Sequence, residues 1–112
     1  MSDAKKFDQG KPRMELLPSS ALLEISKVLS EGAKKYDPWN WAKGLQYSRL
    51  IGAVMRHVSA WKDGEDKDPE TGLSHLAHAA CGLMFLLDYL DRNQTHLDDR
   101  RPLETRRSVK TD

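Results

Sequence analysis

Two histidines lie three residues apart, at His75 and His78, directly after an acidic segment that runs from Asp63 to Glu70. In a helix, residues three apart share one face, and their side chains lean toward the N-terminal end, where the acidic segment is. Carboxylates and imidazoles can therefore converge. Oxygen ligands suit Mg²⁺, and imidazole also suits Mn²⁺ or another transition metal. The pattern predicts a divalent metal site with ligands from Glu65, Asp68, Glu70, His75 and His78.

The same residues have a plainer interpretation. An acidic run with glycine and proline is typical of a solvated turn, and histidines on an apolar helix are often hydrogen-bonded core residues. Arg56 and His57 favour the interpretation as a functional site. They interrupt a stretch of residues that are otherwise apolar or small, and a buried charge needs a partner. We expect the Arg56 guanidinium to point inward. It can pair with the acidic loop or with an anionic ligand, and the spacing alone leaves both open.

A second group of residues combines cations with aromatic and amide side chains. Cations can hold phosphates, a ring can stack on a base, and an amide can read the edge of the base. This combination indicates a nucleotide site, although tryptophans that only close the end of a helical bundle give the same pattern. The candidate residues are Lys11, Arg13, Lys35, Tyr36, Asn40 and Trp41.

Three helices are expected to position these groups. Apolar residues recur at helical spacing over residues 19–36 and again from a serine cap at Ser48 to a stop at Gly64. A third helix is expected to begin near Pro69 or Leu73. No segment is convincing as a strand, so we predict an all-α protein, a bundle of three main helices per chain.

The expected organisation along the chain has three parts. Residues 1–18 form an extended arm that docks through Leu16 and Leu17, residues 19–90 form the helical catalytic domain, and residues 91–112 form a polar, flexible tail. The third helix carries no acid, lysine or arginine over residues 71–87, and its leucines form a seam. Because two other helices hardly cover such a helix, we predict a homo-oligomer, a dimer or higher.

Composition narrows the classes of function. The 112 residues contain 18 Lys and Arg against 17 Asp and Glu, so bulk charge does not predict binding to a nucleic acid polymer. No segment reaches the ~18 apolar residues of a membrane span, and the N-terminal residues lack an apolar leader. Cys81 is the only cysteine, which excludes an intrachain disulfide. A cytoplasmic protein, of a cell or of a virus within it, fits best.

The segments GKPRMELLP, EGAKKYDPWNW and RHVSAWKDGEDKDPETGLSHLAHAACGLMFLL resemble the phage-borne family called dATP/dGTP diphosphohydrolase, N-terminal domain, over roughly residues 7–88. The resemblance implies metal-dependent hydrolysis of dATP or dGTP to the monophosphate and pyrophosphate, with Mg²⁺ or Mn²⁺, in the host cytoplasm if the protein is phage-encoded. The family name also implies a relation to the all-α pyrophosphohydrolases of the MazG type, in which carboxylates on two adjacent helices hold magnesium.

The residues and the resemblance together lead to a hypothesis for the role of each candidate residue. One or two divalent ions are held by Glu65, Asp68, Glu70, His75 and His78. An uncommitted carboxylate or His57 accepts the proton of the attacking water. The phosphates are held by Arg56, Lys11, Arg13 and Lys35, and the base by Tyr36, Asn40 and Trp41.

This chain departs from the MazG-type pattern, because His75 and His78 fall where that pattern has an acidic pair, and Arg56 and His57 fall near its paired glutamates. Imidazole is a poor ligand for magnesium. Either the metal is a different one, or the carboxylates of the loop bind the magnesium instead. Two alternatives stay open. One is another class of metal phosphohydrolase that releases triphosphate or phosphate, and the other is a non-catalytic module for nucleotide binding or oligomerisation.

Overall fold

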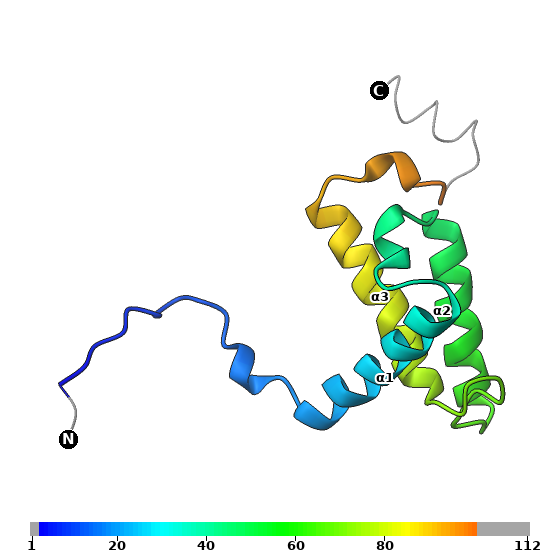
Figure 1. The fold of residues 1–112 in the computed structure, drawn as a ribbon, viewed down its shortest axis with the longest axis horizontal. Helices are drawn as coiled ribbons and strands as arrows, with labels where there is room; N and C mark the ends of the chain where they lie inside the picture. The colour runs from blue at the N-terminus through cyan, green and yellow to red at the C-terminus, as the bar shows by residue number, and fades with distance from the viewer. Residues whose placement is uncertain (1–2, 101–112) are drawn as a thin grey trace.

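The computed structural model describes residues 3–100, and within that range it is all-α, as predicted. The three main helices are α1 (Ser19–Lys35), α2 (Tyr47–Lys62) and α3 (His75–Asp91) (Figure 1). Short 3₁₀ turns, η1 (Met14–Leu16), η2 (Asn40–Lys43) and η3 (Thr95–Leu97), lie between and beyond them. None of the helices described is both long enough and apolar enough to cross a membrane.

The helices α2 and α3 run antiparallel, side by side, and α1 packs across α3 (Figure 1). The contact between α2 and α3 has a glycine, Gly82, on the α3 side. A Cβ atom at Gly82 would lie 2.6 Å from Cγ2 of Val54, closer than two carbon atoms can approach. Glycine at position 82 therefore lets the two helices pack at this distance. At the far end, Tyr47, Leu50 and the fully buried Tyr89 form the core.

The helix boundaries differ from the prediction at two caps. The third helix begins at His75, later than Pro69 or Leu73, because the side chain of Ser74 accepts hydrogen bonds from the first-turn N–H groups of α3. The helix α2 has Gln46 as its N-cap residue, so the predicted cap at Ser48 is wrong. Both the N–H and the hydroxyl of Ser48 instead donate to Asp99, at 2.8 and 2.6 Å.

The first part of the expected flexible tail folds back onto α2. Leu97 packs against the core cluster, and the Tyr47 hydroxyl donates to the carbonyl of Gln94 at 3.2 Å. With the Asp99 contact to Ser48, this segment closes the N-terminal end of α2. The folded part of the chain therefore extends past residue 91, where the tail was expected to begin. Leu97 and the Asp99 carboxylate anchor this otherwise polar segment. The rest of the expected tail lies outside the described residues.

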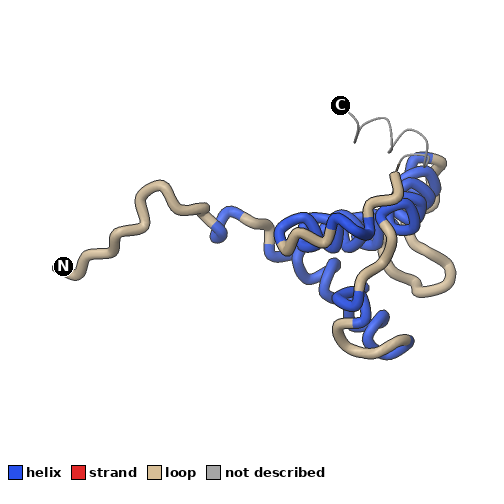
Figure 2. The backbone as a smooth tube through the Cα atoms, turned by 90° about the horizontal axis from the view of Figure 1, so that it is seen from above, coloured by secondary structure: helices blue, strands red, loops and turns tan. Residues whose placement is uncertain are grey.

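The N-terminal arm extends away from the helices (Figure 2). Leu16 and Leu17 are both exposed, so the expected docking of the arm through these leucines does not occur within one chain.

The leucines of the predicted seam on α3 are exposed in a single chain. Leu76, Leu83, Leu87 and Leu90 have exposed fractions of 44%, 47%, 68% and 53%, while Gly82 of α3 faces Val54 of α2. The packing at Gly82 brings the backbones of α2 and α3 close together, and the leucine face of α3 remains exposed to solvent. Within the described residues, the chain therefore presents a large apolar helix face that it does not cover. Oligomerisation stays a prediction.

Candidate metal and nucleotide site

The acidic loop between α2 and α3 is held in a defined shape by its own backbone. The N–H of Asp68 donates to the carbonyl of Leu73 at 2.8 Å, and the N–H of Gly72 donates to the carbonyl of Asp68 at 2.7 Å. Oδ1 of Asp68 accepts the N–H of Glu70 at 2.7 Å. The side chain of Asp68 is 17% exposed, so this carboxylate is fixed in place, unlike a solvated acid.

Three histidines meet beside this carboxylate, one from α2 and two from the first turn of α3. The Nδ1 atoms of His57 and His75 lie 2.9 Å apart, so one ring donates to the other. The rings of His57 and His78 stack with centroids 4.5 Å apart and planes 9° from parallel. Oδ2 of Asp68 lies 3.8 Å from Nδ1 of His57. The α2–α3 packing thus brings together residues that are far apart in the chain.

One donor atom from each of His57, Asp68 and His75 lies within 4.8 Å of the other two. Two imidazole nitrogens and one carboxylate oxygen are a donor set that suits Mn²⁺, Fe²⁺ or Zn²⁺ better than Mg²⁺. Glu65 accepts a 2.6 Å hydrogen bond from Nε2 of His75, which leaves the lone pair on Nδ1 of His75 pointing at His57. The donor chemistry and the tautomer that Glu65 favours both fit a divalent transition metal.

The other predicted ligands have other partners. Glu65 stands behind His75 and orients it. Glu70 lies 3.3 Å from Nζ of Lys35, an exposed pair that links the loop to the end of α1. Nε2 of His78 lies 2.8 Å from the hydroxyl of Thr71. Sequence reasoning missed Thr71, for which a threonine beside a turn glycine is the only signal, and it assigned His57 to proton transfer and not to metal binding.

Burial and neighbouring groups shift the pKa values of His57, His78 and Asp68. Burial lowers the pKa of His57 and of His78, and the neighbouring histidines lower it further. Burial opposes the ionisation of Asp68, but the N–H of Glu70 and the nearby imidazoles outweigh it, and the pKa of Asp68 falls below 3.8. At neutral pH the two imidazoles are therefore neutral and the carboxylate is charged.

These shifts predict how stability depends on pH in the metal-free protein. Folding lowers the pKa of His57 and His78 from 6.5, so the unfolded chain binds more protons once the pH falls below that value. The free energy of unfolding should be highest above about pH 6.5 and fall as the histidines are protonated, with a further loss below about 3.8 from Asp68. Urea unfolding with chelator at about pH 7.5, 6 and 5 measures this. A smaller pH dependence is expected for His78→Asn, and an equal one would contradict the assignment.

A cavity of about 900 Å³ opens beside the histidine cluster. It lies between the end of α1, the connection from α1 to α2, and the facing parts of α2 and α3. Nine of the thirteen predicted site residues line it: Lys35, Tyr36, Asn40, Trp41, Arg56, His57, Asp68, Glu70 and His78. The structure therefore unites the two groups that the sequence presents separately, the cations with aromatics and the acids with histidines.

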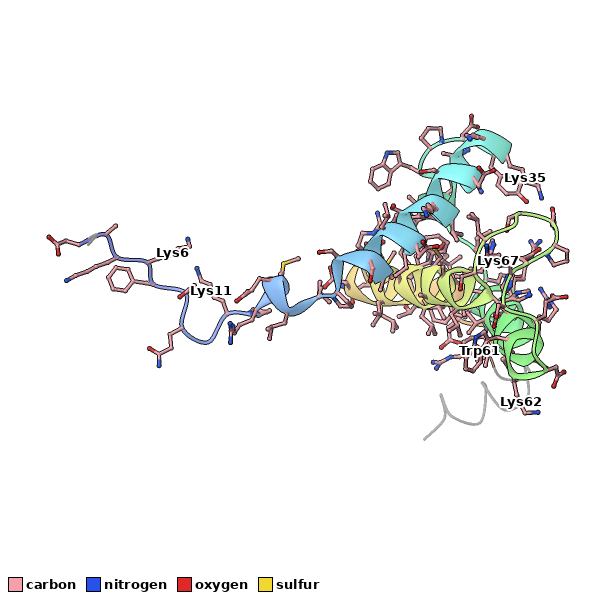
Figure 3. The ribbon with its side chains drawn as sticks, turned by 90° about the horizontal axis from the view of Figure 1, so that it is seen from below. Lys6, Lys11, Lys35, Trp61, Lys62 and Lys67 are labelled. Carbon is pink, nitrogen blue, oxygen red and sulfur yellow. The ribbon has the colours of Figure 1, made fainter. Side chains whose placement is uncertain are left out.

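Two predicted phosphate ligands are not at the cavity. Lys11 lies out on the extended arm, away from Lys35, which marks the end of α1 (Figure 3). Arg13 lies on the same arm, where it pairs with Glu15 at 2.9 Å, and both side chains are exposed. Among residues 3–100, the cations that line the cavity are Lys35 and Arg56.

Arg56 does not point inward as expected, and of the two partners left open, the acidic loop is not the one it has. The residue is exposed, and no carboxylate of residues 3–100 lies within ion-pair distance of it. Nη1 of Arg56 would lie 3.3 Å from a Cβ atom at Gly52, so the guanidinium lies back along the helix over a residue without a side chain. Arg56 therefore lines the cavity as a cation without an acidic partner in the part of the chain described.

Trp41 serves the packing of the helices. Its ring stacks on Phe85 with centroids 4.9 Å apart and planes 7° from parallel, and its carbonyl accepts the hydroxyl of Tyr89. The guanidinium of Arg92 lies over the same ring. The alternative in which a tryptophan closes the end of the bundle thus describes Trp41 well, while Lys35, Tyr36 and Asn40 stay available at the cavity wall.

Fold and site together define an all-α protein whose helices line an open cavity with a histidine–carboxylate cluster at one end. The family model for dATP/dGTP diphosphohydrolase, N-terminal, matches residues 1–100. The chain belongs to this family, which confirms the resemblance read from the sequence.

A relative from Salmonella phage PMBT28, described as dATP/dGTP diphosphohydrolase, is 47% identical over 96 residues. The match covers 86% of this chain and 32% of the relative, so the chain spans about a third of the length of that curated protein. No solved structure matches the chain.

Proposed function

We propose that this chain hydrolyses purine deoxynucleoside triphosphates, dATP or dGTP, to the monophosphate and pyrophosphate, with a divalent metal. The observation that carries the proposal is one cavity with a histidine–carboxylate cluster and with cations and aromatic residues in its wall. Such a set serves a ligand that has charged phosphates and a planar base. The family match and the description of the phage relative support this substrate class.

His57, Asp68 and His75 would hold the metal, which supplies neutralisation of phosphate charge and a lowered pKa for water. Glu65 keeps Nδ1 of His75 directed at the cluster. Arg56 and Lys35 bind the phosphates from the cavity wall, Arg56 through its planar fork. Glu70 lines the cavity outside the cluster and accepts the proton of the attacking water. The water oxygen bonds to the α-phosphorus, the bond to the bridging oxygen breaks, and pyrophosphate leaves.

Product analysis in ¹⁸O-labelled water tests this reaction. With dATP or dGTP and Mn²⁺ or Mg²⁺, we expect monophosphate and pyrophosphate, with the label in the monophosphate because water attacks the α-phosphorus. Label in pyrophosphate would place the attack at the β-phosphorus. Nucleoside plus triphosphate would identify another class of phosphohydrolase. Nucleotide binding without turnover at high protein concentration would identify a non-catalytic module.

We also propose that a second copy of the chain covers the leucine face of α3. Leu83, Leu87 and Leu90 follow one another at steps of four and three, the spacing of a helix-pairing seam. Their exposure in a single chain is the observation that supports self-association.

A further inference from the structure

Trp39 has a backbone conformation that its side chain does not favour. Its φ and ψ of 66° and 20° lie in the left-handed region, which bulky residues rarely adopt. The conformation is fixed by the turn that η2 begins, where the N–H of Ala42 donates to the carbonyl of Trp39 at 2.9 Å. Glycine or asparagine would adopt this conformation at a lower cost in free energy. The backbone conformation therefore does not explain why a tryptophan occupies this position.

Packing does not supply the reason either, because 71% of Trp39 is exposed. Its only ring neighbour among the described residues is Trp41, at 5.9 Å between centroids and tilted by 47°. Trp41 itself is committed, with Phe85 stacked on it and Arg92 over it. Of the two tryptophans in the cavity wall, Trp39 is thus the one with an accessible ring face.

We propose that Trp39, and not Trp41, is the surface on which the purine base stacks. The proposal rests on the function proposed above, since Trp39 lines the same cavity as Lys35 and Arg56. A strained, exposed aromatic residue at a cavity rim is the kind of position where backbone strain accompanies ligand binding. Stacking on a tryptophan ring tolerates any base, so this contact provides affinity for a nucleobase, and discrimination among bases comes from polar groups.

The test compares two probes and two substitutions at one position. Trp39→Gly removes the ring and relieves the strained φ, and Trp39→Phe keeps a ring. The probes are dGTP, which has a base, and inorganic triphosphate, which has none, each titrated with Mn²⁺ by calorimetry. We expect Trp39→Gly to weaken dGTP binding about tenfold or more and to leave triphosphate binding unchanged. Trp39→Phe should stay within about threefold of wild type.

Trp61→Phe is the matched control, because Trp61 is also exposed but is not among the residues that line the described cavity. It should bind both probes as wild type does. The melting temperature of Trp39→Gly should be no lower than that of wild type, since relief of strain offsets the greater freedom of glycine in the unfolded chain.

The outcomes separate this inference from the proposed function. If wild type binds neither probe with Mn²⁺, the proposed function fails and the stacking role falls with it. If wild type binds dGTP and Trp39→Gly binds it equally well, the inference alone is overturned. Equal loss of both probes, or a lower mass in solution for Trp39→Gly, also overturns it, because Trp39 would then serve the fold or an interface.

Discussion

Asp68→Asn is expected to reduce the proposed metal-dependent hydrolysis of dATP and dGTP about a thousandfold or more. The substitution keeps the size of the side chain and an oxygen that can accept the N–H of Glu70, but it removes the only carboxylate of the three-residue cluster. Charge neutralisation by a metal contributes several kcal/mol to the transition state, and each ~1.4 kcal/mol is worth tenfold in rate. Binding of Mn²⁺, measured by calorimetry or electron paramagnetic resonance, should be lost together with activity.

Asp63→Asn is the control for this experiment. Asp63 belongs to the same acidic loop, its side chain is 72% exposed, and its nearest cation is Lys62 at 3.8 Å. The control should keep both activity and metal binding, which separates the loss of one ligand from the loss of loop charge. A variant of Asp68 that keeps wild-type Mn²⁺ affinity but melts far lower would show that the carboxylate serves only the loop.

Leu87→Glu is expected to convert an oligomer to monomers at micromolar protein. In a two-fold symmetric assembly one substitution acts twice, and an interfacial leucine contributes roughly 1.5–3 kcal/mol through burial. The loss is thus about 3–6 kcal/mol, a factor of roughly a hundred or more in the dissociation constant, before the cost of burying charge. Leu87 is 68% exposed in one chain, so the helical circular dichroism should survive. Light scattering gives the mass.

Ser59→Glu adds the same charge to an exposed position of α2 and should leave the mass unchanged. A wild-type protein that is monomeric at micromolar concentration would contradict self-association. The leucine face would then call for a different occupant, such as a segment of a longer chain.

Helical periodicity predicted the number and approximate bounds of the helices, because apolar spacing is a local property. It also predicted that the leucines of α3 share a face, but not that this face stays outside. That choice depends on the contact of Gly82 with Val54, two residues on different helices, and a close approach of two backbones leaves no periodic signal. The cap at Ser74 was missed because Pro69 and Leu73 offered competing starts.

The candidate site was predictable as a collection of residues and not as a set of roles. Acids and histidines next to each other in the sequence led us to expect that these side chains converge, and they lie together at one end of the cavity. Which of them form the cluster depends on where each ring nitrogen points. For His75 the orientation follows from the hydrogen bond between its Nε2 atom and Glu65. His57 joined the cluster through helix packing, which local spacing does not encode. Lys11 was assigned by residue type alone, and the arm carries it elsewhere (Figure 3).

The close packing at Gly82 divides the cavity wall into a part that resists change and a part that accommodates it. Gly82 and Val54 both line the cavity, and any larger residue at 82 would push α2 and α3 apart together with the histidines they carry. We therefore expect divergence toward ligands of another size in other parts of the wall, such as the exposed residues of the connection over 36–46. Within such a family, the chemistry would be inherited through the helices and ligand preference would evolve in the connection.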